Sequence, residues 1–173
     1  MSNRIPHQAV ILLGSNLGNP RKQLQRSLAL LGEKGHIAAI STIYRTAPWG
    51  ESNQADFLNM VLLLETMLSP KALLLACQDI EKQLHKNKKT PWGERSIDVD
   101  ILFYDDLVVD VSDLQIPHPR LHLRRFTLIP LVELIPLKKH PLLQKNMQEL
   151  LAICPDGLAV HPESPIPVLT SKA

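Results

Sequence analysis

The sequence predicts an α+β fold in which helices cover a mainly antiparallel sheet. The first observation behind this prediction is the order of the apolar patterns, which is strand, helix, strand, strand, helix, strand (βαββαβ) and is typical of a ferredoxin-like core with helices on both faces. The second is composition: 173 residues, 45% hydrophobic and 21% charged, suffice for one globular domain with its own core. We therefore expect residues 1–173 to form a single domain with C-terminal additions to the core.

The first strand and helix are marked by an apolar run, a turn and a helix cap. Ala9–Leu13 is apolar and is closed by Gly14–Asn16, which predicts a buried strand that ends in a turn. Asn19 before Pro20 is an N-cap and first-turn signal. Apolar residues at helical spacing then extend the predicted helix to residue 32: Leu24, Leu28 and Leu31.

Two β-like runs and a second helix follow. His36–Arg45 and Phe57–Glu65 are predicted strands, separated by the polar loop Thr46–Ala55. Ser69 before Pro70 repeats the cap signal. The residues Leu73, Cys77, Ile80 and Leu84 give the predicted helix one apolar face down to about residue 85, where Cys77 is expected in the core.

The last core strand is predicted over Ile97–Tyr104, which alternates at first and is fully apolar later. Beyond it the patterns indicate one more strand at 107–111 and helices at 124–134 and 145–153. Residues 162–173 are rich in proline and are expected to form a tail that hugs the surface or frays.

Charge and cysteine content exclude several classes of protein. The net charge is +2, too small for a generalised binder of nucleic acid or anionic membranes. The two cysteines, Cys77 and Cys154, match no metal-ligand or redox spacing, which favours a reducing compartment. The apolar run at 9–13 is too short for a signal peptide or a membrane span. A cytoplasmic protein is expected.

The most informative motif is Asp98-Val99-Asp100 within a predicted strand. Residues two apart point to the same face, about 7 Å from each other. Such a carboxylate pair suits Mg²⁺, which commonly uses one or two carboxylates together with phosphate oxygens. The alternative is that both side chains simply face water on the polar side of the strand.

Negative and positive charges fall in separate segments around this carboxylate pair. Residues 98–113 hold six Asp and no Lys or Arg, whereas both flanking segments are basic: Lys82, Lys86, Lys88, Lys89 and Arg95 precede it, and Arg120, Arg124 and Arg125 follow it. Cations beside a carboxylate pair suit a magnesium-bound polyphosphate. A solvated basic loop and ordinary helix-end arginines are the alternative. No glycine-rich nucleotide loop of a common type is present.

Three weaker signals leave their alternatives open. Gly14–Gly18 before a helix could hold an anion through backbone amides or could serve only as a connection. Trp49 and Trp92 lie in polar loops, where they could stack on a ligand or pack on the rim of the core.

Together the motifs resemble the 6-hydroxymethyl-7,8-dihydropterin pyrophosphokinases, from about residue 9 to residue 137. The segments that carry the resemblance are Gly14-Ser-Asn-Leu-Gly18, Tyr44-Arg-Thr-Ala-Pro-Trp-Gly50, Asp56-Phe-Leu-Asn59, Trp92-Gly-Glu-Arg-Ser-Ile-Asp-Val-Asp-Ile101 and Ile116-Pro-His-Pro-Arg120.

The resemblance implies transfer of pyrophosphate from ATP to the pterin hydroxymethyl group, with release of AMP, in folate biosynthesis. It implies two Mg²⁺ ions held by Asp98 and Asp100. It also implies Arg95, Lys86 and Asp100 as catalytic residues, with Asp100 placed to accept the hydroxyl proton. The implied ATP-binding residues are Gln78, Glu81, Lys88, Trp92, Arg95, Ile101, His118 and Arg124. The implied pterin-binding residues are Thr46, Ala47, Trp49, Phe57, Asn59 and Phe126, with the two phenylalanines sandwiching the ring. A monomer without nucleic-acid or membrane partners is expected.

The sequence departs from the family pattern at two places. Residues 85–88 read His-Lys-Asn-Lys where the family has Gly-Arg-x-Arg, so Lys86 lacks the planar fork of arginine and His85 disfavours a positive φ. Leu123 and Arg125 replace an acidic and a small residue. A weakened relative that only binds pterin or nucleotide is therefore the second reading. A ferredoxin-like nucleic-acid binder is the third, disfavoured by the acidic residues at 98–113.

Overall fold

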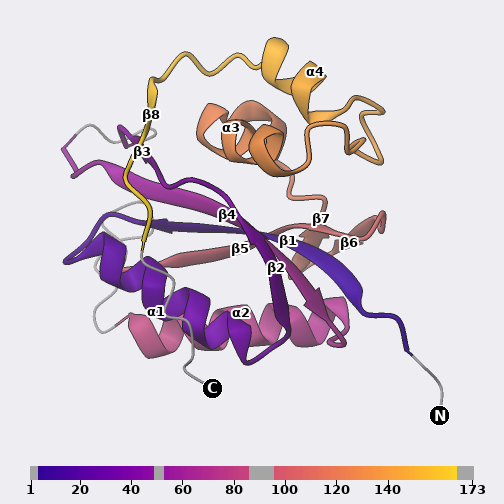
Figure 1. Ribbon diagram of the computed structural model, residues 1–173. Coiled ribbons are helices and arrows are strands. Elements are labelled where there is room, and N and C mark those ends of the chain that lie inside the picture. The colour runs from indigo at the N-terminus through magenta and orange to yellow at the C-terminus, as the bar shows by residue number, and fades with distance from the viewer. Residues whose placement is uncertain (1–3, 49–52, 86–95, 167–173) are drawn as a thin grey trace.

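A computed structural model describes residues 4–48, 53–85 and 96–166 as an α+β fold built in three layers. In Figure 1, helices α1 (Pro20–Gly32) and α2 (Pro70–Leu84) lie on one side of the sheet, and α3 (Arg125–Leu134) and α4 (Met147–Ala152) lie on the other. The predicted placement of helices on both faces is therefore confirmed. Within the described ranges, no helix combines the length and the apolar character that crossing a bilayer would require.

The sheet has the strand order of a ferredoxin-like core. Its centre is formed by β5 (Asp98–Tyr104), β1 (His7–Ser15) and β4 (Phe57–Thr66), with β1 antiparallel to both neighbours. Strands β2 (His36–Ile40) and β3 (Tyr44–Thr46) both pair with β4. The order across the sheet is therefore β5, β1, β4 and then β2 and β3. Every pairing in this sheet is antiparallel, as predicted.

Both predicted helix caps are present. The Asn19 side chain accepts a hydrogen bond from Lys22 N at 3.1 Å and begins α1, and the Ser69 side chain accepts from Ala72 N at 3.2 Å and begins α2. Each cap satisfies a backbone N–H that has no partner inside the helix. The predicted apolar face of α2 is buried, including Cys77, where burial raises the thiol pKa to about 12.

The strand predicted over residues 36–45 is split into β2 and β3. The break falls at Ser41, which still bonds to β4: its N–H donates to Val61 O at 2.8 Å, and its hydroxyl oxygen accepts from Val61 N at 2.9 Å. A side-chain oxygen thus replaces the backbone carbonyl that an unbroken strand would supply. β-branched composition alone does not reveal such an exchange.

The C-terminal additions are richer than predicted. The strand predicted at 107–111 is one half of a hairpin, β6 (Val109–Val111) and β7 (Leu114–Ile116). The short helix η1 (Leu121–Leu123) precedes α3, and a capping box of Asn146 and Glu149 begins α4. Strand β8 (Val160–Pro162), which was not predicted, pairs with β3, and Ile166 beyond it is 9% exposed and part of the core.

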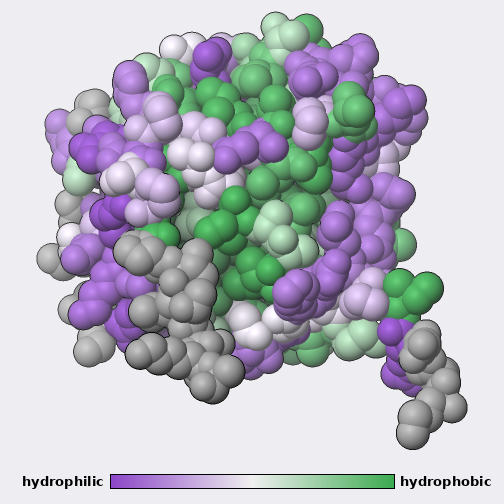
Figure 2. Space-filling model, viewed as in Figure 1, coloured by the Kyte–Doolittle hydropathy of each residue, from purple (hydrophilic) through white to green (hydrophobic). Residues whose placement is uncertain are grey.

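Two apolar clusters hold the layers together, because side chains alternate across each strand. On β1, Ile11 and Leu13 pack toward α1 and α2, whereas Val10 and Leu12 belong to the cluster that contains α3 residues such as Leu128. Figure 2 shows further hydrophobic residues gathered over the middle of the face seen in Figure 1, between the two helical layers. Within the described residues, both faces of the sheet are therefore packed against helices.

Candidate active site

A cleft of about 550 Å³ lies on the α3 side of the sheet, across the ends of four strands. Its floor includes a row of residues in register: Asp98 of β5 lies opposite Gly14 of β1, which lies opposite Asn59 of β4. Asp100 and Leu12 form the neighbouring pair of the next row. The predicted metal ligands and the predicted pterin ligand Asn59 are thus brought to one surface.

The carboxylates at the β5 end of the cleft are held by backbone geometry and by α2. Asp98 and Asp100 are half-buried on the cleft face of β5, and Val99 between them is buried on the other face. The backbone N–H of Val99 donates to Glu81 Oε1 at 2.9 Å, so the last turn of α2 fixes the strand that carries both aspartates. Glu81 also lines the cleft.

Gly14 provides the space between the carboxylates and Asn59. A Cβ at position 14 would lie 2.9 Å from Asn59 Oδ1, closer than real Cβ atoms approach an oxygen. Asn59 is buried, and its Nδ2 donates to Thr46 Oγ1 at 2.9 Å. The amide plane of Asn59 is therefore fixed by the neighbouring strand, and a glycine on the central strand leaves room for it.

The segment before α3 contributes one histidine and two arginines to the cleft that holds the carboxylates. His118, Arg120 and Arg124 all line it. Burial, together with the charges of Arg124 and Arg120, lowers the pKa of His118 to about 4, so this ring is neutral near pH 7. Its Nδ1 accepts from the backbone N–H of Arg120 at 3.1 Å, which leaves the proton on Nε2.

Arg124 is the more enclosed of the two arginines. Burial lowers the pKa of its guanidinium, as does the charge of Arg120, while Asp100 and Asp98 act in the opposite direction. The guanidinium carbon lies 5.8 Å from the centre of the Phe126 ring, within the range of a cation–π contact. The cleft therefore holds both positive and negative groups, which suits a ligand that combines anionic groups with a cation.

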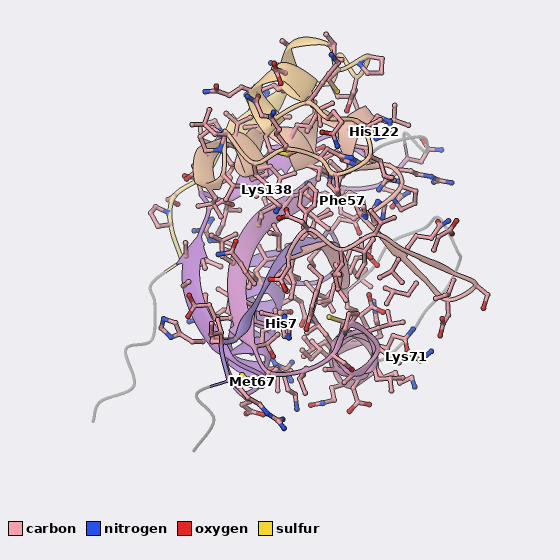
Figure 3. All side chains as sticks on the ribbon, turned by 90° about the vertical axis from the view of Figure 1, so that its right-hand side faces the viewer. His7, Phe57, Met67, Lys71, His122 and Lys138 are labelled. Atoms are coloured by element: carbon pink, nitrogen blue, oxygen red, sulfur yellow. The ribbon has the colours of Figure 1, made fainter. Side chains whose placement is uncertain are left out.

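Aromatic rings complete the end of the cleft near β3. Phe57 of β4 and Phe126 of α3 both line it, together with Thr46 and Ala47. Figure 3 shows Phe57 between the sheet and the layer that holds His122. Two aromatic side chains beside a fixed amide suit a flat heterocycle with hydrogen-bonding edges.

The Gly14–Gly18 turn connects the segments on both sides of the cleft. The hydroxyl of Ser15 donates to the Ser96 carbonyl, and Asn16 Nδ2 donates to Gln54 Oε1 at 3.0 Å and to Ala55 O at 3.1 Å. These side-chain contacts agree with the interpretation as a structural connection, and binding of an anion by the backbone amides of the turn stays a prediction.

The aspartates of the acidic segment 98–113 do not gather at one site. Only its first two aspartates line the cleft. Asp105 bonds His7 Nδ1 at 2.6 Å and the N–H of Gln8, whereas the later aspartates pair outside the cleft, Asp106 with Lys138, Asp110 with Gln115 and Asp113 with Lys71. The partners of the later aspartates, three of four of them distant in sequence, hold these carboxylates away from the cleft.

Most predicted site residues within the described ranges meet in this cleft. Those that line it are Thr46, Ala47, Phe57, Asn59, Glu81, Asp98, Asp100, His118, Arg124 and Phe126. Gln78 is exposed on α2 and Ile101 is buried in the core beneath α2, and neither lines the cleft. The predictions for Trp49, Lys86, Lys88, Trp92 and Arg95 fall outside the described residues.

Sequence reasoning missed several lining residues and raised one unnecessary concern. Leu12, Gln54, Pro119 and Arg120 were not predicted as ligands, although Arg120 belongs to the flanking basic residues noted above. His85 was expected to disfavour a positive φ, but it ends α2 with φ −90°, which any residue adopts. That substitution therefore introduces no backbone strain at residue 85.

The donor set fits a magnesium ion that is completed by a ligand. Within residues 4–48, 53–85 and 96–166, no group of three or more His, Cys, Asp or Glu side chains is arranged to hold a metal. Asp98 and Asp100 supply hard carboxylate oxygens on one face, which is the number that Mg²⁺ uses when phosphates and waters provide the rest. A free-standing structural metal site is not formed by these residues.

The fold and the cleft define a class: a ferredoxin-like α+β protein with a cleft that is lined by a carboxylate pair, two arginines and two aromatic rings. The family model for 7,8-dihydro-6-hydroxymethylpterin-pyrophosphokinase matches residues 10–136. The chain belongs to this family, as the sequence motifs indicated.

Curated relatives agree with this assignment. A protein of Aquifex aeolicus named 2-amino-4-hydroxy-6-hydroxymethyldihydropteridine pyrophosphokinase is 40% identical over 79% of this chain and 86% of its own length. Proteins of the same name from Bacillus subtilis and Pseudomonas aeruginosa are 39% and 37% identical, over 73% and 84% of this chain and 77% and 90% of their own lengths.

Solved structures agree in fold. A Plasmodium falciparum HPPK-DHPS triple mutant with SDX-DHP matches with a TM-score of 0.71 at 18% identity, over 88% of this chain. The match spans 42% of that longer protein. At this identity the likeness supports the ferredoxin-like fold and nothing further.

Proposed function

We propose that this chain transfers pyrophosphate from ATP to the hydroxyl group of 6-hydroxymethyl-7,8-dihydropterin and releases AMP, as a step of folate biosynthesis. The observation that carries the proposal is the joint placement of the carboxylate pair, the two arginines and the aromatic end in one cleft of a chain that belongs to this family. We place the pterin at the β3 end and the triphosphate between β5 and the segment 118–124.

At the pterin end, Phe57 and Phe126 stack on the two faces of the ring, and Asn59 reads its edge. The bond from Asn59 Nδ2 to Thr46 Oγ1 uses one N–H and sets the direction of the second N–H and of Oδ1. Paired donors and acceptors in fixed directions discriminate one heterocycle from another.

At the triphosphate end, Arg124 and Arg120 neutralise phosphate charge, and neutral His118 donates from Nε2 without adding charge. Asp98 and Asp100 would hold Mg²⁺, which supplies charge neutralisation and a template for the phosphate oxygens. The pterin hydroxyl oxygen forms a bond to the β-phosphorus, and the bond between that phosphorus and the oxygen of the α-phosphate breaks. AMP leaves with this oxygen, and the Asp100 carboxylate takes the hydroxyl proton. Positioning and charge neutralisation do most of this work.

The decisive experiment is product analysis with ATP, Mg²⁺ and 6-hydroxymethyl-7,8-dihydropterin. We expect AMP and the pterin diphosphate in equal amounts, and no AMP when a 6-methyl pterin without the hydroxyl is supplied. ADP as the product, or no AMP at any protein concentration, would overturn the proposal. The second reading, a relative that binds without turnover, predicts pterin binding without AMP.

A further inference from the structure

The short strand β3 is held by two carboxylates from elements far away in the chain. β3 has three residues, is separated from β2, and is followed by the loop that carries Ala47. One carboxylate is Glu133 of α3, on the cleft side of the sheet. The other is Glu163, which directly follows β8, the strand paired with β3. The last residue of β3, Thr46, is buried and receives the Asn59 hydrogen bond that fixes the cleft amide.

Glu133 makes three hydrogen bonds to the start of this strand. Its Oε1 accepts from the N–H and from the hydroxyl of Thr42, both at 2.9 Å, and its Oε2 accepts from the Tyr44 hydroxyl at 2.7 Å. Burial and this carboxylate raise the pKa of Tyr44 to about 12, so the phenol stays protonated as a donor. Helix α3 also carries Phe126, which lines the cleft. Glu133 therefore connects the helix that supplies Phe126 to β3, the strand that supplies Thr46.

Glu163 holds the intervening residues. Its backbone N–H donates to Ile43 O at 2.8 Å, and its Oε1 accepts from Arg45 Nε at 2.6 Å. Residues Thr46, Arg45 and Tyr44 pair in turn with Val160, His161 and Pro162 of β8. The four consecutive residues 42–45 are therefore bonded alternately to α3 and to the C-terminal segment.

The C-terminal segment is itself anchored directly after Glu163. Arg21 of α1 donates to Ser164 O at 2.5 Å and to Pro165 O at 3.1 Å, and Ile166 is buried in the core. The match to the family model ends at residue 136, so residues 160–166 lie beyond it. The chain thus uses a segment outside the family match to restrain a strand at the pterin end of the cleft.

We propose that Glu133 and Glu163 are positioning residues for the pterin: they hold β3 so that Thr46, Ala47 and Asn59 keep the geometry that binds the heterocycle. The proposal rests on the proposed function for the identity of the ligand. Both carboxylates act through Thr42–Arg45 and not on the nucleotide, since the groups that face the triphosphate come from β5, α2 and residues 118–124. Their loss therefore weakens pterin binding selectively.

The test compares Glu133→Ala and Glu163→Ala with the conservative variants Glu133→Gln and Glu163→Gln. The control is Asp113→Ala, which breaks an exposed ion pair with Lys71 on the α2 side, away from Phe57 (Figure 3). Binding of 6-hydroxymethyl-7,8-dihydropterin is followed by its fluorescence in the presence of Mg²⁺ and α,β-methylene-ATP, and nucleotide binding is measured separately by calorimetry. Hydrogen exchange of residues 42–47 is measured without ligand.

For each alanine variant we expect pterin Kd to rise about 5- to 10-fold, since one or more hydrogen bonds to a charged group are lost. Nucleotide Kd should change less than twofold, exchange at 42–47 should accelerate, and the glutamine variants should recover part of the affinity because an amide oxygen still accepts. Asp113→Ala should change none of these quantities.

Unchanged exchange at 42–47 in both alanine variants, or an equal loss of pterin and nucleotide affinity, would overturn the positioning role. An unfolding midpoint measured for each variant separates global loss of structure from the local effect. If an alanine variant does not fold, the glutamine variants, which retain the side-chain volume, take its place. Absence of AMP from the unaltered protein would overturn the proposed function alone, because the exchange measurement needs no substrate.

Discussion

Replacing Gly14 by alanine should damage the pterin end of the cleft through a single side chain. The new Cβ would lie 2.9 Å from Asn59 Oδ1, whereas ordinary contacts begin near 3.4 Å, so the amide must move by about 0.5 Å. Asn59 is buried and its Nδ2 is bonded to Thr46 Oγ1 at 2.9 Å, so this movement strains or breaks that bond. The lost hydrogen bond is worth about 1–2 kcal/mol of folding free energy, and misdirected pterin contacts should raise pterin Kd about 5- to 30-fold.

The assay is a pair of titrations on the same preparations, urea unfolding for stability and pterin fluorescence for affinity. The matched control is Gly32→Ala at the end of α1, where nothing lies within 4 Å of the added Cβ. Alanine there should leave pterin Kd unchanged and should hold or slightly raise stability, because glycine costs about 1 kcal/mol in a helix.

One result would refute the reasoning about the cleft floor. If Gly14→Ala binds pterin within twofold of the unaltered protein while Gly32→Ala behaves as expected, then Asn59 does not read the heterocycle from its position on β4. A loss of nucleotide affinity without a loss of pterin affinity would likewise show that the added methyl group acts on Asp98, its neighbour on β5.

Three further outcomes are expected. Asp98→Ala and Asp100→Ala should each reduce AMP formation at least ~100-fold while the unfolding free energy changes by less than about 1 kcal/mol, because both side chains are half-buried and serve a ligand; near-normal turnover in either variant would remove the metal role. Ser41→Ala should destabilise the protein by about 1–3 kcal/mol in thermal or urea unfolding, since Val61 N loses its buried acceptor, and a neutral effect would mean that another acceptor replaces it. His140 is buried, its Nδ1 accepts from Leu142 N and Leu143 N, and burial lowers its pKa to about 4. His140 therefore takes up a proton near pH 6.5 in the unfolded chain but only near pH 4 in the folded chain, so the unfolding free energy should fall by about 1 kcal/mol per pH unit as the pH drops from 6.5 toward 4. His140→Asn should lessen this slope, and an unchanged slope in the variant would contradict the assignment.

What the sequence predicts well are features set by neighbours along the chain. The caps at Asn19 and Ser69 place α1 and α2, and the alternation of Asp98, Val99 and Asp100 places two carboxylates on one face of β5. Each depends only on residues within a few positions, so pattern and spacing suffice.

What it does not predict depends on partners far away in the chain. The Ser41 hydroxyl replaces a carbonyl for Val61, and β8 is a strand only because β3 lies beside it. The aspartates after residue 100 are drawn to partners outside the cleft, which no local count of acidic residues reveals. Tertiary pairing overrides composition in each case.

The floor of the cleft and its β3 wall differ in the contacts that hold them in position. Leu12 and Gly14 lie on β1, which is paired on both sides along its length, whereas Thr46 and Ala47 lie at the end of a three-residue strand. A compound that takes its affinity from the floor meets a surface already in its bound form, so little conformational entropy is lost there. Groups added toward β3 meet a wall whose position depends on the Glu133 and Glu163 hydrogen bonds, so we expect their contribution to affinity to fall in Glu133→Ala and Glu163→Ala, whereas the contribution of groups on the floor stays unchanged.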